Sequence, residues 1–295
     1  MAASFNSPWG VAVDSSDAVL VADRGNNKIR KISAAGNVST IAGSGAAAFG
    51  DGPGSTASFN VPQGVAVDSS GSIYVADSTN CAIRKISSAG MVSSLAGSPL
   101  ACGGPVDGTG SSASFNNPVA LTMAPDGRVV VGDTYNHLVR IVTTTGLVSS
   151  LPATATAFPD IRGIATDAAG NIYYPDNNSA RIFKAAPGGA VTVFSGSGAI
   201  GMTDGPASTA TFTSPYGVVA DARGNVFVSD SRVIRKITPT GRVTTIVGTA
   251  YVPGNADGVG SAASFDLPTG MSIDQAGNLY VADAGNNNVR KIAAE

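Results

Sequence analysis

The stretch GVAVDSSGSIYVADSTNCAIRKI, residues 64–86, decides the fold of this chain. Its apolar runs are short, rich in Val, Ile and Tyr, and separated by turn-forming Ser, Gly and Asn, which is typical of β-strands joined by tight turns. The expected strands are 63–68, 72–77, 82–87 and, just beyond the quoted stretch, 91–97. Nearly the same sequence recurs at residues 10–32 and 270–292. The repetition predicts a protein built from copies of one four-stranded unit.

A phenylalanine marks the start of each copy. It occurs at Phe5, Phe59, Phe115, Phe158, Phe212 and Phe265. The spacings are 54, 56, 43, 54 and 53 residues, so six units account for almost the whole chain. No segment of twelve or more residues has the 3.6-residue apolar period of an amphipathic helix. We therefore expect an all-β protein with almost no helix.

Two architectures repeat a β-unit along a chain. A β-solenoid needs a shorter period and parallel stacking, whereas a β-propeller uses about 40 or more residues for each four-stranded blade. Propeller sheets are buried on both faces, which explains why runs such as GVAV and IYVA are almost continuously apolar. The sequence predicts one domain over residues 1–295, a six-bladed β-propeller of four-stranded antiparallel blades. The blades are expected to start near residues 5, 59, 115, 158, 212 and 265.

The repeated pattern PxGVAVDxxGxIYVADxxNxxIRKIxxxGxVxTxAG resembles the NHL repeat, and the resemblance covers residues 5–295. It implies a β-propeller. Propellers of this kind act as RNA-binding platforms, extracellular sensor domains, adhesion modules and, in a related lyase, as an enzyme. The resemblance is therefore specific for the fold and carries little information about function.

Composition limits the classes of partner. The chain has a net charge of −2 and only 13% charged residues, whereas a nucleic-acid binder usually has a basic surplus. We predict no nucleic-acid partner, and RNA binding ranks third among the functions considered. No stretch of about 18 apolar residues occurs, so no membrane insertion is expected. Few charges and abundant Ser, Thr and Gly favour an extracellular or cell-surface location.

An aspartate recurs at the end of the second strand of every unit. The six positions are Asp23, Asp77, Asp133, Asp176, Asp230 and Asp283. An arginine follows on the third strand in five units, as Arg30, Arg84, Arg140, Arg235 and Arg290, whereas unit four has Phe183 at the corresponding place. Because equivalent positions lie on different blades, we predict that each aspartate caps its following turn and pairs with the arginine, and not a metal or acid–base site.

A second phrase, Asp-Gly, lies in the connections between units, at residues 51–54, 107–110, 204–207 and 257–260. The third unit lacks it. Asp-Gly favours turns that need positive φ. Calcium requires six to eight oxygen ligands, which one short loop rarely supplies, so a turn is the preferred interpretation.

Motifs for catalysis are sparse. The only histidine is His137, so Ser-His-Asp and Cys-His chemistry would depend on one loop residue, which we interpret as a surface position. The segment GSGAIG, 196–201, matches GxGxxG, but no helix opens after it to meet a phosphate. The only glutamate is Glu295. We assign no catalytic or metal-ligating residue and expect no cofactor.

One position varies in chemistry while its neighbours repeat. It is the middle residue of the Pro-x-Gly step at the start of each innermost strand, occupied by Trp9, Gln63, Val119, Arg162, Tyr216 and Thr269. Either each side chain covers its neighbouring blade, or the ring forms a recognition surface at the channel mouth. Loops on the same face add Arg24, Asn27, Thr79, Tyr135, His137 and Asn178. The candidate ligand-binding set is Trp9, Gln63, Arg162, Tyr216, Thr269, Tyr135 and His137.

These observations predict a non-catalytic binding module that recognises a protein, peptide or glycan on the loop-rich face at the channel mouth. The alternative is a metal-dependent, lactonase-like propeller enzyme that uses carboxylates at the channel mouth. Three or more Asp or Asn oxygens converging there would favour the enzyme.

Three further expectations concern the blades themselves. Cys81 opens a third strand and Cys102 lies in the loop that returns over it, so we predict a disulfide between them. Unit six stops where its fourth strand should begin, so blade six should have three strands and expose the edge 288–292. We expect the chain to be a segment of a longer protein that completes the blade, and the exposed edge to permit self-association.

Overall fold

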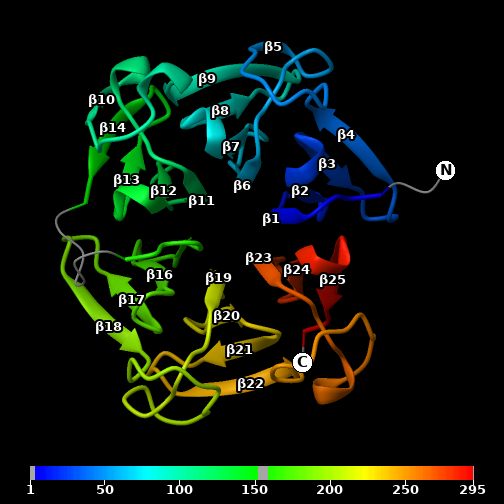
Figure 1. Cartoon of the computed structure of the whole chain (residues 1–295), viewed down its shortest axis with the longest axis vertical. Coiled ribbons are helices and arrows are strands. Elements are labelled where there is room, and N and C mark those ends of the chain that lie inside the picture. The colour runs from blue at the N-terminus through cyan, green and yellow to red at the C-terminus, as the bar shows by residue number, and fades with distance from the viewer. Residues whose placement is uncertain (1–3, 152–158, 295) are drawn as a thin grey trace.

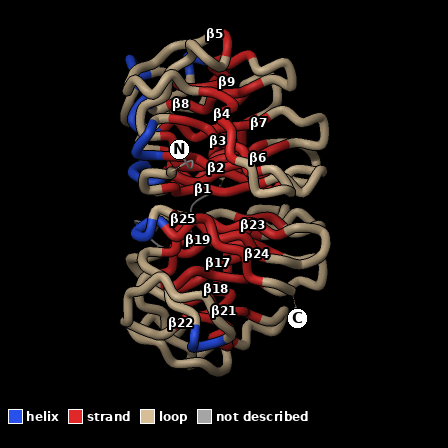
Figure 2. The backbone as a smooth tube through the Cα atoms, turned by 90° about the vertical axis from the view of Figure 1, so that its right-hand side faces the viewer, coloured by secondary structure: helices blue, strands red, loops and turns tan. Residues whose placement is uncertain are grey.

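The computed structural model describes residues 4–151 and 159–294; Phe158 and Glu295, singled out in the sequence, lie outside this range. Six antiparallel sheets surround a central axis, so the predicted all-β, six-bladed β-propeller is confirmed (Figure 1). From the side, the blades form a disc with its short 3-10 turns gathered toward one face (Figure 2). The described residues contain no longer helix.

Blades one to three contain the following strands. Blade one has β1 (Pro8–Val13), β2 (Val19–Asp23), β3 (Lys28–Ile32) and β4 (Val38–Ala42). Blade two has β5 (Gly52–Pro53), β6 (Pro62–Val67), β7 (Ile73–Asp77), β8 (Ala82–Ile86) and β9 (Met91–Gly97). Blade three has β10 (Gly108–Thr109), β11 (Pro118–Met123), β12 (Val129–Asp133), β13 (Leu138–Val142) and β14 (Leu147–Ser150).

Blades four to six complete the ring. Blade four has β15 (Ala165–Thr166), β16 (Ile172–Asp176), β17 (Arg181–Ala185) and β18 (Val191–Ser195). Blade five has β19 (Pro215–Ala220), β20 (Val226–Asp230), β21 (Val233–Ile237) and β22 (Val243–Gly248). Blade six has β23 (Pro268–Ile273), β24 (Leu279–Asp283) and β25 (Asn288–Ile292), the three strands that the sequence predicts.

Within the described residues, seven 3-10 turns connect the strands. Those between second and third strands are η1 (Arg24–Asn26), η2 (Ser78–Asn80), η5 (Thr134–Asn136) and η7 (Ala284–Asn286). Those in the connections between blades are η3 (Pro99–Ala101), η4 (Gly110–Ser112) and η6 (Gly260–Ala262).

Three of the Asp-Gly connections also pair with outer strands. Gly52–Pro53 forms β5, which pairs with the outer strand β9 of the following blade, and Gly108–Thr109 forms β10, which pairs with β14 in the same way. Gly205 makes an equivalent bridge to Val243 in blade five. These three connections are thereby hydrogen-bonded to the outer strand of the blade that each enters.

The second-strand aspartates are buried and pair with the third-strand arginines, as predicted. Arg84 contacts Asp77 at 2.7 Å and Arg140 contacts Asp133 at 2.8 Å, with all four side chains fully buried. Burial raises the pKa of Asp77, which the hydrogen bonds and charge of its partners only partly offset. The buried Asp–Arg pairs therefore join the second and third strands within these blades.

The predicted cap on the following turn is wrong for most of these aspartates. At Asp23, Asp77, Asp133 and Asp283 the carboxylate accepts no backbone capping bond from the 3-10 turn that follows. The turn contributes only a side-chain amide, as where Nδ2 of Asn80 donates to Oδ2 of Asp77 at 2.9 Å. Instead, Oδ1 of Asp77 accepts from the backbone N–H of Asn60, which lies 17 residues earlier, at 2.7 Å. The carboxylate thus joins the second strand to the connection that enters the blade, a partner that local sequence does not show. Asp176 does bond forward, to the N–H of Asn178.

The Gly of the Pro-x-Gly step allows neighbouring innermost strands to approach closely. A Cβ on Gly217 would lie 2.0 Å from the carbonyl oxygen of Thr269, and one on Gly10 would lie 2.3 Å from that of Gln63. Real side chains do not tolerate such distances, so glycine is required where one blade passes the next. Blade three has Ala120 at this position.

The ring closes between blades six and one, which lie side by side in Figure 1. The Thr269 hydroxyl donates to the carbonyl of Trp9 at 2.9 Å, and the Ser7 N–H donates to Oδ1 of Asn287 at 2.6 Å.

Cys81 and Cys102 form the predicted disulfide, with their Cα atoms 5.3 Å apart. It links η2 to the connection after β9.

We predict that Gly217→Ala lowers the free energy of unfolding by about 3 kcal/mol, because the added methyl would overlap the Thr269 carbonyl. Urea denaturation of the purified protein measures the change. Gly188→Ala is the matched control, since a Cβ there meets nothing within 4 Å, and it should change stability by less than about 0.5 kcal/mol. Equal stability of the two variants would contradict the close approach of the strands.

We also predict that replacing both cysteines by serine lowers the free energy of unfolding by about 2–3 kcal/mol. The disulfide closes a loop with a sequence separation of 21, and its loss frees that loop in the unfolded chain. Unfolding is compared with and without dithiothreitol. The reductant should destabilise the unaltered protein and leave the Cys81→Ser/Cys102→Ser variant unchanged; a response of the variant would overturn the assignment.

Candidate functional site

The innermost strands place the variable rim position at one mouth of the central channel. The side chains at this position differ between odd- and even-numbered blades. Trp9, Val119 and Tyr216, from blades one, three and five, pack together with Ala284. The Trp9 and Tyr216 rings meet edge to face with centroids 6.1 Å apart. These apolar surfaces therefore pack against one another at the channel mouth.

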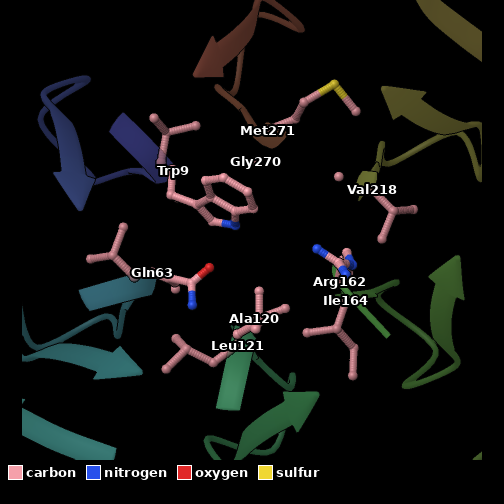
Figure 3. A pocket seen from close by; sticks show the side chains of 16 residues that line it. Trp9, Gln63, Ala120, Leu121, Arg162, Ile164, Val218, Gly270 and Met271 are labelled. Carbon is pink, nitrogen blue, oxygen red and sulfur yellow. The ribbon is translucent and has the colours of Figure 1, made fainter. Parts of the chain in front are cut away.

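The rim residues of the even-numbered blades are polar. Gln63 and Arg162 project with Trp9 into the channel, each from a different blade (Figure 3). Thr269 does not join them: it is 1% exposed, and its hydroxyl donates to the carbonyl oxygens of Trp9 and Ala282. Thr269 therefore closes the ring and does not face a ligand, contrary to its place in the predicted set.

Above the rim lies an open basin of about 250 Å³. Its lining consists of Trp9, Arg24, Val61, Gln63, Thr79, Asn117, Val119, Thr134, Tyr135 and Arg162. A smaller space of about 50 Å³ continues into the channel among the innermost strands. Trp9, Gln63, Val119 and Arg162 line both, so these four residues form the floor of the basin. We call this basin the mouth basin.

Two guanidinium groups give the mouth basin positive charge. The guanidinium carbon of Arg24 lies 4.9 Å from the centroid of the Trp9 ring, and that of Arg162 lies 5.2 Å from the centroid of Tyr216. Burial disfavours the charge on Arg162, but the 2.8 Å hydrogen bond to Asp160, together with the electrostatic effects of Tyr216, Asp160 and Tyr135, raises its pKa. Within the described residues Arg24 has no carboxylate partner, and its Nε atom is buried without a hydrogen bond.

No aspartate or glutamate lines the mouth basin among the residues that the structure describes. Asp160 faces Arg162 through a 2.8 Å ion pair and is not part of the lining. In the same described part of the chain, no three His, Cys, Asp or Glu side chains gather as they would around a metal ion. The convergence of carboxylates that would favour the enzyme is not found there.

Of the other loop residues predicted on this face, some line the basin and others do not. Tyr135, 59% exposed, and Thr79 line the basin as expected. His137 lies outside the lining and has Nδ1 3.0 Å from the carbonyl of Pro159. Asn27 accepts the N–H of Val61 at 2.9 Å and so links blade one to blade two. Asn178 is also outside the lining.

Three lining residues belong neither to the candidate ligand-binding set nor to the other rim and loop residues expected on this face. Val61 and Asn117 each directly precede the proline of the Pro-x-Gly step and have φ values of 57° and 51°, which are uncommon for residues other than glycine. Thr134 directly follows Asp133, the aspartate that ends the second strand of blade three. The position before the proline could have been found from the repeat, because it precedes the rim residue in every blade.

Comparison with known proteins agrees with this architecture. The family model of the Teneurin NHL domain matches residues 99–256, and that of the NHL repeat matches residues 5–32, 59–86 and 265–292. The chain belongs to the NHL-repeat β-propeller family. The resemblance inferred from the repeated pattern is thereby confirmed.

Two curated proteins illustrate the relatives of this NHL propeller. It is 29% identical over 284 residues to Protein SUPPRESSOR OF QUENCHING 1, chloroplastic, of Arabidopsis thaliana, covering 85% of this chain and 27% of that protein. It is 30% identical over 221 residues to human Teneurin-4, covering 65% of this chain and 8% of that protein. The chain thus spans about a quarter of one relative and under a tenth of the other.

Solved structures share the fold at low sequence identity. A Bacteroides thetaiotaomicron protein aligns with a TM-score of 0.80 at 21% identity, covering 100% of this chain and 71% of the other. An auxiliary nutrient binding protein from the same organism aligns at 0.75 and 16%, covering 98% and 69%. A Xanthomonas campestris gluconolactonase aligns at 0.68 and 14%, covering 98% and 86%. These likenesses concern the fold alone.

No helix in the described ranges is long and apolar enough to span a membrane.

Proposed function

We propose that this NHL propeller is a non-catalytic binding module whose mouth basin recognises an anionic group on a protein, peptide or glycan. The observation that carries the proposal is the lining itself, which combines two guanidinium groups with an exposed tyrosine and lacks a carboxylate among the described residues. Guanidinium groups bind carboxylates and phosphates through charge-assisted hydrogen bonds, and aromatic faces pack on sugars and apolar side chains.

Arg24 is the residue expected to contact the ligand's charge. Its stacking on Trp9 restrains the side chain, so less conformational entropy is lost when a ligand binds. Arg162 is already paired with Asp160, so it contributes a fixed hydrogen-bonding group more than an unneutralised charge. Gln63 and Asn117 supply amide donors and acceptors beside them, which suits a ligand with further polar groups.

The enzyme alternative has less support from the lining. The structural likeness to a gluconolactonase keeps a propeller hydrolase as the second candidate. A metal-dependent reaction of that kind would need several oxygen ligands at the channel mouth. Asn117 is the only Asp or Asn among the described lining residues, which favours binding.

We further propose that the protein works outside the cell or on its surface. The Cys81–Cys102 disulfide supports this location, since disulfides persist mainly in oxidising compartments.

The proposal predicts that acidic ligands are selected when peptide and glycan arrays are probed with the purified protein. For a ligand found in this way, Arg24→Gln should weaken binding about tenfold or more and reduce its dependence on salt, because one charge-assisted contact is lost. Tyr135→Ala should weaken binding without changing the salt dependence.

Arg128→Gln is the control for net charge. Arg128 lies in the turn between β11 and β12, at the opposite ends of these strands from the mouth basin, and pairs with Asp126. This variant should bind as the unaltered protein does. Selection of neutral or basic ligands, or equal binding by Arg24→Gln and Arg128→Gln, would contradict the assignment. All binding variants are compared after their melting temperatures have been shown to be equal.

A further inference from the structure

The outer part of blade two contains a three-residue cluster that joins the third strand, the outer strand and the incoming connection. Nη2 of Arg84 in β8 forms an ion pair with Oδ1 of Asp51 at 2.5 Å. Oδ2 of Asp51 accepts the backbone N–H of Ser94 in β9 at 3.1 Å, and Oδ1 accepts the Ser94 hydroxyl at 3.2 Å. Ser94 is the residue directly opposite Arg84 across the β8–β9 pair.

Blades three and five repeat this cluster with different residues. In blade three the members are Arg140, Asp107 and Ser150; in blade five they are Arg235, Asp204 and Thr245. In both, the Ser or Thr again pairs directly with the arginine across the strands. The aspartate thus accepts from one guanidinium, one backbone N–H and one hydroxyl in each of these blades.

Blade four lacks all three members of the cluster. Phe183 replaces the arginine, Val193 is the residue opposite it, and no Asp-Gly precedes this blade in the sequence. The hydroxyl on the outer strand therefore accompanies the arginine: blade one, which has no Asp-Gly before it in this sequence, also places Thr40 opposite Arg30.

Blade six has two members of the cluster and lacks the third. Arg290 in β25 pairs with Asp257 at 2.5 Å, but no outer strand follows within the described residues. The Asp257 side chain is 95% exposed, against 48%, 50% and 43% for Asp51, Asp107 and Asp204. The side chain of Arg290 is 12% exposed, whereas its counterparts Arg84, Arg140 and Arg235 are fully buried.

We propose that the open edge of β25 binds an extended segment that pairs antiparallel with residues 288–292 and places a Ser or Thr opposite Arg290. The N–H and hydroxyl of that residue would donate to Asp257, as Thr245 does to Asp204. The occupant is a strand of the repeat's own outer type, exemplified by VSTIAG at 38–43, VSSLAG at 92–97 and VTTIVG at 243–248. This is strand addition to a sheet edge, directed by a specific side-chain cluster.

A second copy of β25 would be a poor occupant. Its sequence, NVRKI, has no Ser or Thr to donate to Asp257. Antiparallel pairing of two such strands would also bring Arg290 and Lys291 of one copy near those of the other, and like charges facing each other across a sheet are unfavourable. The edge therefore favours an outer-type strand over self-association.

The test uses a fluorescently labelled peptide of residues 241–249, GRVTTIVGT, added to the full chain and followed by anisotropy. We expect saturable binding and slower amide hydrogen exchange in β25. A peptide carrying Thr245→Val should bind about tenfold more weakly, the loss expected when a hydrogen bond to a charged acceptor is removed.

Variants of the protein test whether Asp257 is the group that the peptide contacts. Asp257→Asn should weaken the unaltered peptide to a similar degree, and the valine peptide should lose little more on this variant, because both changes remove the same contact. Asp17→Asn, which neutralises an exposed aspartate of blade one, should bind as the unaltered protein does. Absence of binding, or binding unaffected by Asp257→Asn and by Thr245→Val, would overturn the proposal. So would a dimer in sedimentation velocity that the peptide does not dissociate.

Discussion

One buried arginine on the third strand holds each regular blade together. In blade two, Arg84 bonds to Asp77 at the end of β7, to the carbonyl oxygens of Ser58 and Gly50, and to Asp51. Its guanidinium carbon also lies 5.4 Å from the centroid of the Phe59 ring. Because an unpaired buried charge is very unfavourable, these acceptors must be assembled around it, and their assembly joins strands and connections that are distant in sequence. The Phe, Asp and Arg of the repeat are the parts of this one arrangement.

The same arrangement explains where the repeat is free to vary. Once the strands and connections are held in this way, the innermost strands approach so closely that the position after the rim residue is glycine in five of the six blades. The backbone carbonyl of the rim residue lies at these close approaches, as those of Gln63 and Thr269 do, but the approach does not fix which side chain the rim residue carries. Trp9, Val119 and Tyr216 pack together at the channel mouth, and Trp9, Gln63, Val119 and Arg162 line the mouth basin.

Blade four departs most from the repeat and supplies a charged residue of the basin. It has Phe183 in place of the arginine, stacked on Tyr174 with ring centroids 5.5 Å apart. Its innermost strand is reduced to β15, with a separate bridge between Ile161 and Asp176. Arg162 lies between that bridge and β15, where Asp160 orients it. The loss of the regular cluster and the presence of a functional candidate thus coincide in one blade.

The sequence by itself determined the number of blades, the strands within them, the three-stranded blade six and the pairing of Asp with Arg. These follow from residues within a few positions of one another, and six copies of the pattern reinforce each assignment. It also identified the rim position as the variable one. Which rim side chains reach solvent was decided only by the tertiary structure, because that depends on neighbours from other blades. Thr269 is buried by its bond to Trp9, 260 residues away, and Arg24 joins the basin by stacking on the same tryptophan. Contacts across a closed ring connect the two ends of the chain, and no local pattern records them.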